Sequence, residues 1–594
     1  MRGRAEFFRG IKDELAGEGI HCGWWNTLTV KCSPVPGWQR IIRADGSTLG
    51  FAMCPLEPEY RKRFIENTAV FAENGKPEFI ITEDDYGLHG GCFCARHLAE
   101  FSRREGREWS REALAEALNG DSPEARALYL RWCGLKRDTL ADFAADIRAA
   151  VDAESPEIPI GTCQSGSWDG DGDATEAVSR AFAGSRHRPF SRLHGAFYGG
   201  EDILSIPRTL QHALYYRQHL PEDFICLHES DTFPHSRFFT SAASMRVMMS
   251  IVCSQGFDGS IFQVQQLLDD PNEEKAYAEM HAEELDRFQA MHDAAKQCTL
   301  KGVSLPFVPV FCKGSDWLRC TAHFGIPYVT GNAPAAFLSG NQIPYLSDET
   351  LTEYFRKGLF LDGDAALALF KRGFGGLMGC DVGPDAVSGM ETFDLGGREV
   401  IEPGFAPGSV GRNMHRPGFF APRGNGASFN LIPREGAEVI TRLVTFRRKE
   451  LGVGMIRFVN RLGGRIVVMG MGTAGNQSSS LFNYRRQKLI QEQLVWCGAD
   501  VVFVKNDPRV FIVMNEADDP AEAGFSGMLT VTNLNPDDLK EIALYLPESW
   551  RKSDRVRRLN RNGKWQMQQI EKTPDGIRIP ALFRYAGPQV FLFE

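Results

Sequence analysis

Short apolar runs that alternate with helical segments are the feature that most constrains the fold of this 594-residue chain. Such an alternation is typical of parallel βα units, in which a helix returns the chain to the same end of the sheet. The first half of the sequence therefore predicts an α/β fold with a parallel sheet. Its expected strands are 20–30, 78–82, 157–163, 192–198, 224–228 and 258–264.

The pattern restarts near residue 302 and changes again near residue 500. A second α/β region is expected to contain strands at 308–312, 328–331 and 376–380, helices at 348–357, 364–372 and 483–496, and a long loop at 403–428. From about residue 500 the chain has only short alternating strands, which predicts a small β domain, a β-sandwich. Three domains are thus expected, at 1–300, 301–500 and 501–594.

Charge and cysteine content narrow the class of protein. The formal net charge is −9 and no Lys/Arg-rich run occurs, which argues against nucleic acid or an anionic membrane as the main partner. No apolar stretch approaches the roughly 20 residues of a membrane helix. The 14 cysteines do not form a disulfide framework in so long a chain, so we expect a cytoplasmic protein.

Two of the expected strands end in carboxylates. Glu83, Asp84 and Asp85 follow strand 78–82, and Glu229 follows strand 224–228. An acidic turn in solvent would explain the first group, and a cap or ion pair the second. Glycoside hydrolysis, however, needs a pair of carboxyl groups, one to protonate the leaving oxygen and one to attack or to activate water. Two intervening strands place the two groups three βα steps apart.

A metal-binding pattern follows the first acidic group. Cys92, Cys94 and His97 have the spacing of metal ligands, and Cys54 can supply a fourth. Four protein ligands make a closed tetrahedral zinc site, which is structural rather than catalytic. The alternative is three ordinary cysteines and a surface histidine.

With these motifs the sequence resembles the glycoside hydrolase family 42 β-galactosidases of clan A, and more closely the related trimeric β-mannosidases. That family has Asn-Glu-Tyr-Gly at its acid/base, followed by a cysteine zinc cluster. The resemblance assigns Asp85 as acid/base, Asp84 and Tyr86 as substrate-binding residues and Glu229 as nucleophile. It also assigns the zinc ligands Cys54, Cys92, Cys94 and His97.

The resemblance implies a (β/α)8 TIM barrel, an amidotransferase-like α/β domain that forms a homotrimer, and a C-terminal β domain. It further implies a retaining exo-β-glycosidase that hydrolyses terminal β-linked hexosides of a small oligosaccharide or glycoside, with structural Zn²⁺ and no catalytic cofactor. Asp replaces both the Asn and the Glu of the family motif, and the loop 50–53 lacks an expected arginine. β-Mannoside and β-galactoside therefore both stay open as substrates.

The clan A plan also places three strands before the one that carries the acid/base, yet only 20–30 precedes 78–82 here. About 70 residues, or two βα units, are missing from that plan. We therefore expect an N-terminally incomplete barrel that begins at the second barrel helix.

Four further residues near strand ends are candidates for sugar binding: Trp25, Arg192, Tyr198 and Gln263. Core packing or internal hydrogen bonding is the alternative for each. Which of Glu83, Asp84 and Asp85 is the acid/base stays open, although the register with Tyr86 favours Asp85. Two other functions compete, a carbohydrate-binding pseudoenzyme and a zinc-dependent hydrolase.

Overall fold

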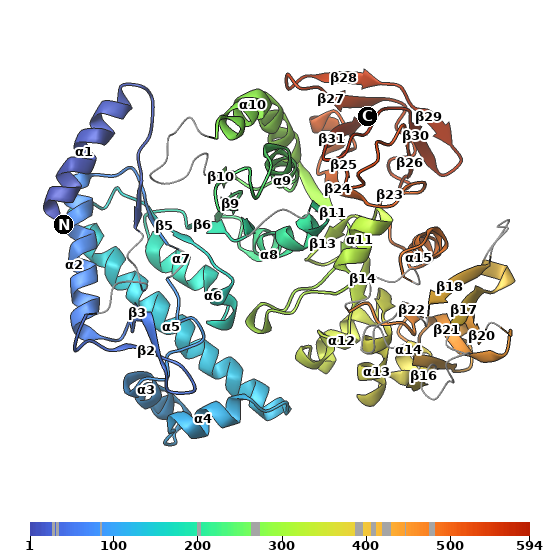
Figure 1. Cartoon of the computed structure of the whole chain (residues 1–594), viewed down its shortest axis with the longest axis horizontal. Helices are drawn as coiled ribbons and strands as arrows, with labels where there is room; N and C mark the ends of the chain where they lie inside the picture. The colour runs from blue at the N-terminus through green and yellow to red at the C-terminus, as the bar shows by residue number, and fades with distance from the viewer. Residues whose placement is uncertain are drawn as a thin grey trace.

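The structure is a computed structural model that describes most of the chain. The described residues are 1–26, 30, 35–83, 86–198, 203–262, 274–385, 396–405, 412–417, 429–445, 447–474 and 481–594. The N-terminal helices lie on the left in Figure 1, and the C-terminal strands lie at the upper right. Between them the chain forms a parallel sheet and then a large mixed sheet.

The first half of the chain forms the predicted parallel sheet. Its six strands follow sequence order, and every neighbouring pair is parallel. All six fall within the expected runs or within two residues of them, and all but β8 are shorter than expected. The strands are β1 (Trp24–Asn26), β4 (Ile80–Thr82), β5 (Ile160–Cys163), β6 (Phe190–Leu193), β8 (Ile225–Glu229) and β10 (Gly259–Ile261).

Helices connect these strands and cover the sheet. The longest, α5 (Pro123–Glu154), begins as its sequence predicts: the Ser122 side chain accepts from the Ala125 N–H, and Pro123 occupies the first turn. Its apolar face, which includes Phe143 and Ile147, is buried against α2 and α7. The other main helices are α1 (Arg2–Ala16), α2 (Pro58–Gly75), α3 (Ala95–Glu105), α4 (Arg111–Leu118), α7 (Thr175–Ala183), α8 (Ile206–His219), α9 (Ala242–Ser254) and α10 (Lys275–Ala295).

A mixed sheet follows, and we call residues 303–496 the mixed-sheet region. Its parallel part is β13 (Tyr328–Val329), β12 (Val303–Ser304), β14 (Ala335–Leu338), β15 (Gly358–Leu361) and β22 (Arg465–Met469). Its antiparallel part is β21 (Glu450–Val459), β20 (Glu438–Thr445), β17 (Gly396–Ile401) and β18 (Asn413–Pro417), with β16 (Cys380–Asp385) and β19 (Phe429–Pro433) paired beside them. Helices include α11 (Leu318–Phe324), α12 (Asp348–Tyr354), α13 (Gly363–Lys371) and α15 (Tyr484–Trp496).

Three expectations for this region were wrong. The run 308–312 is a 3-10 turn, η2 (Pro309–Phe311), because Pro309 has no N–H to donate to a sheet. Most of the run 376–380 lies in a short helix, α14 (Gly375–Met378). Its apolar residues are buried, as those of a strand would be, so the apolar pattern does not distinguish the two. The expected loop 403–428 contains strand β18 and a 3-10 turn, η4 (Pro403–Phe405).

The C-terminal strands form two antiparallel sheets, as the alternating pattern predicts. One contains β11 (Cys298–Lys301), β24 (Val510–Ala517), β25 (Gly527–Asn533), β31 (Gln589–Phe593), β27 (Val556–Leu559) and β28 (Trp565–Gln568). The other contains β23 (Phe503–Val504), β26 (Ile542–Tyr545), β30 (Gly576–Ile579) and β29 (Glu571–Thr573). Strand β11 joins the first of these sheets from far upstream, and the domain boundaries at 300 and 500 stay predictions.

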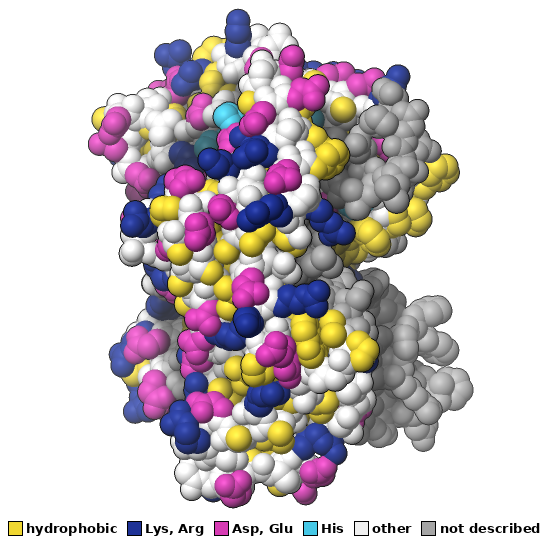
Figure 2. Space-filling view, turned by 90° about the vertical axis from the view of Figure 1, so that its left-hand side faces the viewer, with side chains coloured by type: hydrophobic (Ala, Val, Ile, Leu, Met, Phe, Trp, Pro, Cys, Tyr) yellow, Lys and Arg dark blue, Asp and Glu magenta, His cyan; other side chains and the backbone are white. Residues whose placement is uncertain are grey.

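Figure 2 shows the side of the molecule on which α1 and α2 lie. Basic and acidic side chains are interspersed over this face, with apolar side chains between them. Among the described helices, none is both long enough and apolar enough to cross a membrane.

Candidate active site

Two residues that the sequence predicted at strand ends lie next to each other at the carboxyl ends of the parallel strands. Glu229 is the last residue of β8, and Arg192 lies near the end of the neighbouring strand β6. Arg192 pairs in register with Leu227, two residues before Glu229. Strand β4, which leads to Glu83, is separated from β8 by β5 and β6, so the predicted spacing of three βα steps is present.

Glu229 is buried and makes four polar contacts, which are three hydrogen bonds and one ion pair. Its Oε1 lies 2.9 Å from Nη2 of Arg192 and 2.8 Å from the hydroxyl of Tyr198. Its Oε2 lies 3.0 Å from Nδ1 of His194 and 3.3 Å from the backbone N of Gly195. Because the groups of the described residues that contact these two oxygens are donors, the site is built for a carboxylate anion.

The charge state of Glu229 follows from these contacts. Burial by itself raises the pKa of this carboxyl, but the hydrogen bond from His194 and the charge of Arg192 outweigh it. Together they lower the pKa of Glu229 to about 2. Burial lowers the pKa of the preceding His228 to about 3, so that ring is neutral at pH 7. The site therefore presents an ionised carboxylate beside a neutral imidazole.

Aromatic side chains surround Glu229. The guanidinium of Arg192 lies over the Trp25 ring at 5.2 Å, and the Tyr198 ring contacts Phe233 edge-on at 6.1 Å. Trp25 is 38% exposed and Phe233 59% exposed, so both present an open ring surface. Of the predicted sugar-binding residues, the structure thus gathers Trp25, Arg192 and Tyr198 around Glu229.

Three residues of this site were not foreseen. His194 and Gly195 directly follow β6, and Phe233 lies in the short strand β9 (Thr232–Phe233). Position offered a signal for His194, because a residue two places after Arg192 at the end of a parallel strand points to the same face. No sequence signal distinguished Gly195 or Phe233.

The predicted acid/base segment is described in part. Glu83 follows β4 directly, and its N–H donates to the Asn26 carbonyl. Asp84, Asp85 and Gln263 lie outside the described residues. Tyr86 is not brought to the Glu229 site: it is fully buried, and its hydroxyl donates to the Leu140 carbonyl at 2.8 Å.

The turn after the acidic run is fixed by a buried ion pair. Asp171 accepts from the Leu88 N–H at 2.7 Å, and Nζ of Lys136 lies 3.4 Å from the same carboxyl group. Both charged side chains are almost fully buried. A buried ion pair is costly unless each charge is compensated. Asp171 is compensated by Lys136 and by the Leu88 N–H, so these contacts hold the segment after the acidic run in a fixed position.

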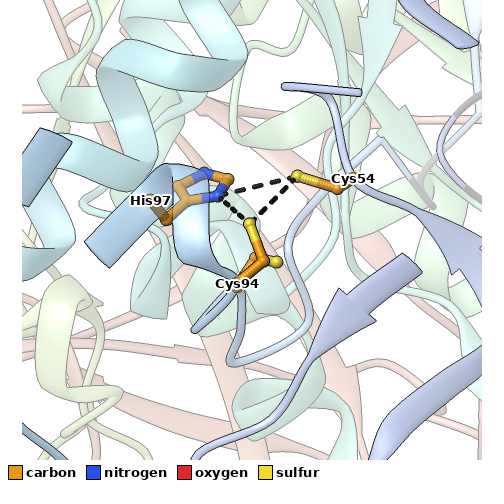
Figure 3. A group of neighbouring side chains, drawn as sticks. Cys54, Cys94 and His97 are labelled. Carbon is orange, nitrogen blue, oxygen red and sulfur yellow. Dashed lines mark hydrogen bonds between the residues drawn. The ribbon is translucent and has the colours of Figure 1, made fainter. Parts of the chain in front are cut away.

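The predicted metal ligands form one buried cluster. Cys54 follows β3 (Thr48–Met53), while Cys94 and His97 lie at the start of α3, and Figure 3 shows these three side chains pointing toward one another. Together with Cys92 their ligand atoms all lie within 4.8 Å of one another. Hydrogen bonds from the Cys54 and Cys92 thiols lower the pKa of Cys94.

The geometry of this cluster fits a tetrahedral ion. Sγ of Cys54 lies 3.7 Å from Sγ of Cys94 and 3.6 Å from Nδ1 of His97, and Sγ of Cys94 lies 3.3 Å from the same nitrogen. Tetrahedral zinc places two sulfurs about 3.8 Å apart, and a sulfur and a nitrogen about 3.6 Å apart. The soft donor set also suits zinc.

Comparisons with solved structures then identify the fold. The chain matches a β-galactosidase from Bacillus circulans sp. alkalophilus with a TM-score of 0.62 and 13% identity, over 99% of this chain and 91% of the other. It matches Gan42B, a GH42 β-galactosidase from G. stearothermophilus, with a TM-score of 0.61 and 12% identity, over 99% of this chain and 90% of the other. A β-galactosidase from Rahnella sp. R3 gives the same values as the latter.

The chain has the fold of the GH42 β-galactosidases. Its parallel sheet is therefore part of a (β/α)8 barrel followed by further α/β and β parts, which confirms the predicted fold class. No family model and no curated protein matches the sequence. In such barrels active-site groups lie at the carboxyl ends of the strands, where Glu229 is found.

Proposed function

We propose that this protein is a retaining exo-β-glycosidase with Glu229 as its nucleophile. The observation that carries the proposal is the buried Glu229 carboxylate, which four donors hold ionised at the carboxyl end of a barrel strand. A retaining mechanism needs such an anion beside the anomeric carbon. The β-galactosidase names of the structural neighbours favour the same reaction class.

In the proposed first step, a Glu229 oxygen forms a bond to the anomeric carbon while the bond to the leaving oxygen breaks. The acid/base residue transfers its proton to that leaving oxygen, which departs as an alcohol. Water then attacks the glycosyl ester and the same residue, now ionised, takes the proton of that water. The second step releases the sugar and returns both carboxyl groups to their starting states.

We assign the acid/base role to Asp85, with Glu83 and Asp84 as alternatives. Replacement of the true acid by Ala spares substrates with good leaving groups in the first step, and it slows substrates whose leaving oxygen needs a proton. Added azide then restores the second step, because it needs no general base. The residue whose Ala variant shows this signature, among Asp85→Ala, Asp84→Ala and Glu83→Ala, is the acid/base.

The proposed substrates are terminal β-hexosides, either β-mannosides or β-galactosides. Trp25, Tyr198 and Phe233 offer ring surfaces of the kind on which sugars stack, and Arg192 offers donors beside Glu229. A screen of aryl β-mannoside, β-galactoside, β-glucoside and β-arabinoside distinguishes the candidates.

Zinc held by Cys54, Cys92, Cys94 and His97 is proposed as a structural ion. When bound, it would crosslink the hairpin of β2 (Arg40–Ile42) and β3 to the start of α3, which follows the acid/base segment. All four protein ligands are present, which leaves no open position for a substrate or water. This argues against the zinc-dependent hydrolase as the alternative.

We further propose a homotrimer in which the mixed-sheet region forms much of the contact between subunits. This proposal rests on the family resemblance, and light scattering at micromolar concentration tests it. A monomer under these conditions contradicts it.

The decisive test of the function is the pair Glu229→Gln and Glu222→Gln. Glu222 is exposed and precedes the same strand, so it controls for loss of a carboxylate. Glu229→Gln is expected to lower turnover of aryl β-glycosides by at least about 1000-fold, while Glu222→Gln keeps it. Absence of turnover by the unmodified protein on the whole screen would leave the carbohydrate-binding pseudoenzyme.

A further inference from the structure

A hydrogen-bonded chain of four side chains lies beside the Glu229 site and has no part in the mechanism above. The Tyr216 hydroxyl lies 2.5 Å from Oδ1 of Asp169 and 2.7 Å from Oδ1 of Asp173. Nε2 of His212 lies 2.8 Å from Oδ2 of Asp169. His212 and Tyr216 belong to α8, and Asp169 to the short helix α6 (Ser167–Gly170).

The protons of this chain can be placed by counting donors. The Tyr216 hydroxyl has one proton but contacts two carboxyl groups, so both contacts are hydrogen bonds only when one carboxyl is protonated. Burial raises the pKa of Asp173, and the charge of Asp169 raises it further. These shifts favour the proton on Asp173, and the Asp169 oxygens accept from Tyr216 and from Nε2–H of His212.

His212 connects this hydrogen-bonded network to the proposed nucleophile, Glu229, through His194. Its ring meets the His194 ring edge to face, with centroids 6.0 Å apart and planes at 75°. Nδ1 of His194 in turn lies 3.0 Å from Oε2 of Glu229. The His194 side chain is 34% exposed, so it depends on its few packed neighbours for a fixed orientation.

Packing alone does not explain a histidine at position 212. Its Nδ1 is buried and has no hydrogen-bond partner among the described residues, which is energetically unfavourable. A leucine or phenylalanine would fill the same space without that cost. What the imidazole adds is the Nε2–H bond to Asp169, which fixes the ring plane that His194 meets.

The mixed-sheet region completes the surroundings of His212. Phe307 packs edge-on against the His212 ring at 5.5 Å, and the thiol of Cys312 lies 3.7 Å from Oδ2 of Asp169. The titratable groups in and around this network include Asp169, Asp173, Tyr215, Tyr216, His219 and Cys312. Those around Glu229 include Arg192, His194, Tyr198 and His228.

We propose that His212 is a positioning residue for His194, and through it for Glu229, with the Asp169 carboxylate holding the His212 ring. The proposal rests on the proposed function insofar as Glu229 is the nucleophile. His194 is thereby kept in the rotamer that donates to Glu229. Because Phe307 and Cys312 of the mixed-sheet region contact this network, the packing of that region against the barrel also affects the geometry of the site.

The test compares His212→Leu, His212→Gln and Asp169→Asn, with His187→Gln as the control. The half-buried His187 lies between α7 and β6, outside this network, and its Nε2 lies 2.8 Å from the carbonyl oxygen of Pro156. His212→Leu is expected to lower kcat on an aryl β-glycoside roughly tenfold with little change in KM, as loss of an orienting group does. His212→Gln keeps a donor for Asp169 and should retain most of kcat.

A second measurement needs no turnover. Diethyl pyrocarbonate modifies neutral histidine, and peptide mass spectrometry follows its rate at His194 against pH. In His212→Leu and Asp169→Asn this rate and its pH dependence should change, and in His187→Gln they should match the unmodified protein. If the protein hydrolyses none of the glycosides, the proposed function fails, yet this measurement still decides the role of His212.

The proposal is overturned if folded His212→Leu and Asp169→Asn leave both kcat and the reactivity of His194 unchanged. Circular dichroism and the melting temperature establish folding. Should His212→Leu not fold, Asp169→Asn and His212→Gln decide in the same way.

Discussion

The guanidinium of Arg192 lies 2.9 Å from the carboxylate of Glu229, and both side chains are almost completely buried. They come from neighbouring parallel strands whose register sets this distance. Removal of one partner from such a pair leaves the other charge buried and uncompensated, which costs about 3–5 kcal/mol. Arg192 thus both stabilises the site and keeps Glu229 ionised.

Arg192→Met should therefore raise the pKa of Glu229 from about 2 toward its ordinary value. Because the nucleophile must be ionised, activity at low pH is lost first, and the acid limb of kcat/KM moves to higher pH. The pH profile measures this shift, with Arg188→Met as the control, since Arg188 is bonded to the exposed Asp223 carbonyl. An unmoved acid limb contradicts the assignment of Glu229.

Gly195→Ala should damage the site through a single methyl group. A Cβ at Gly195 would lie 2.3 Å from Nε2 of His228, and the Gly195 N–H donates to Glu229. Either the backbone at Gly195 or the buried His228 ring must shift, so we expect roughly a tenfold or greater loss of kcat/KM and a lower melting temperature. Gly166→Ala, which meets no atom within 4 Å, is the control. Adding His228→Ala should recover part of the stability, and no recovery would refute the overlap.

His228 should make stability depend on pH. Its pKa is about 3 in the folded protein, against about 6.5 when unfolded, so between these values the unfolded state binds one more proton. The contribution of His228 is fully present above pH 6.5 and is lost as pH falls, by about 2 kcal/mol between pH 6.5 and 5. Urea unfolding at pH 7 and pH 5 should show a smaller difference for His228→Asn than for the unmodified protein. His187→Asn, at a half-buried ring, should keep the full difference.

Zinc content should depend on the cysteine cluster. Freshly purified protein is expected to hold about one zinc per chain, and Cys92→Ser to hold almost none. Chelation should lower the melting temperature more than it lowers the turnover of still-folded molecules, since the ion is structural. Cys298→Ser, outside the cluster, should keep its metal. Metal analysis and thermal unfolding measure both effects, and metal-free native protein would exclude the site.

Sequence was a good guide wherever the signal was local. Apolar runs of a few residues marked the six parallel strands, and Ser122 with Pro123 marked the start of α5, because strand burial and helix capping depend on neighbouring residues. The spacing of Cys92, Cys94 and His97 predicted that these ligands lie together at the start of one helix. Side chains three residues apart at a helix start, such as Cys94 and His97, lie on the same side. Family resemblance supplied the fold class that the solved structures confirm.

Side-chain direction was less predictable where the chain turns. Tyr86 follows β4 at a turn, where neither the period of a strand nor that of a helix applies, and it enters the core instead of the site. The run at 376–380 was wrongly expected as a strand, because a short buried apolar run has no periodicity that separates strand from helix.

The sequence by itself determined the parallel βα order, the carboxylate at the end of β8 and the ligand types of the cysteine cluster. Only the tertiary structure decided that Arg192, His194, Gly195 and Tyr198 all reach Glu229, and that Asp169 and His212 lie behind His194. The physical reason is that strand register and helix packing set these contacts. They join residues from 18 positions apart, as in His194 and His212, to 43 positions apart, as in Asp169 and His212, and no local pattern extends over such separations.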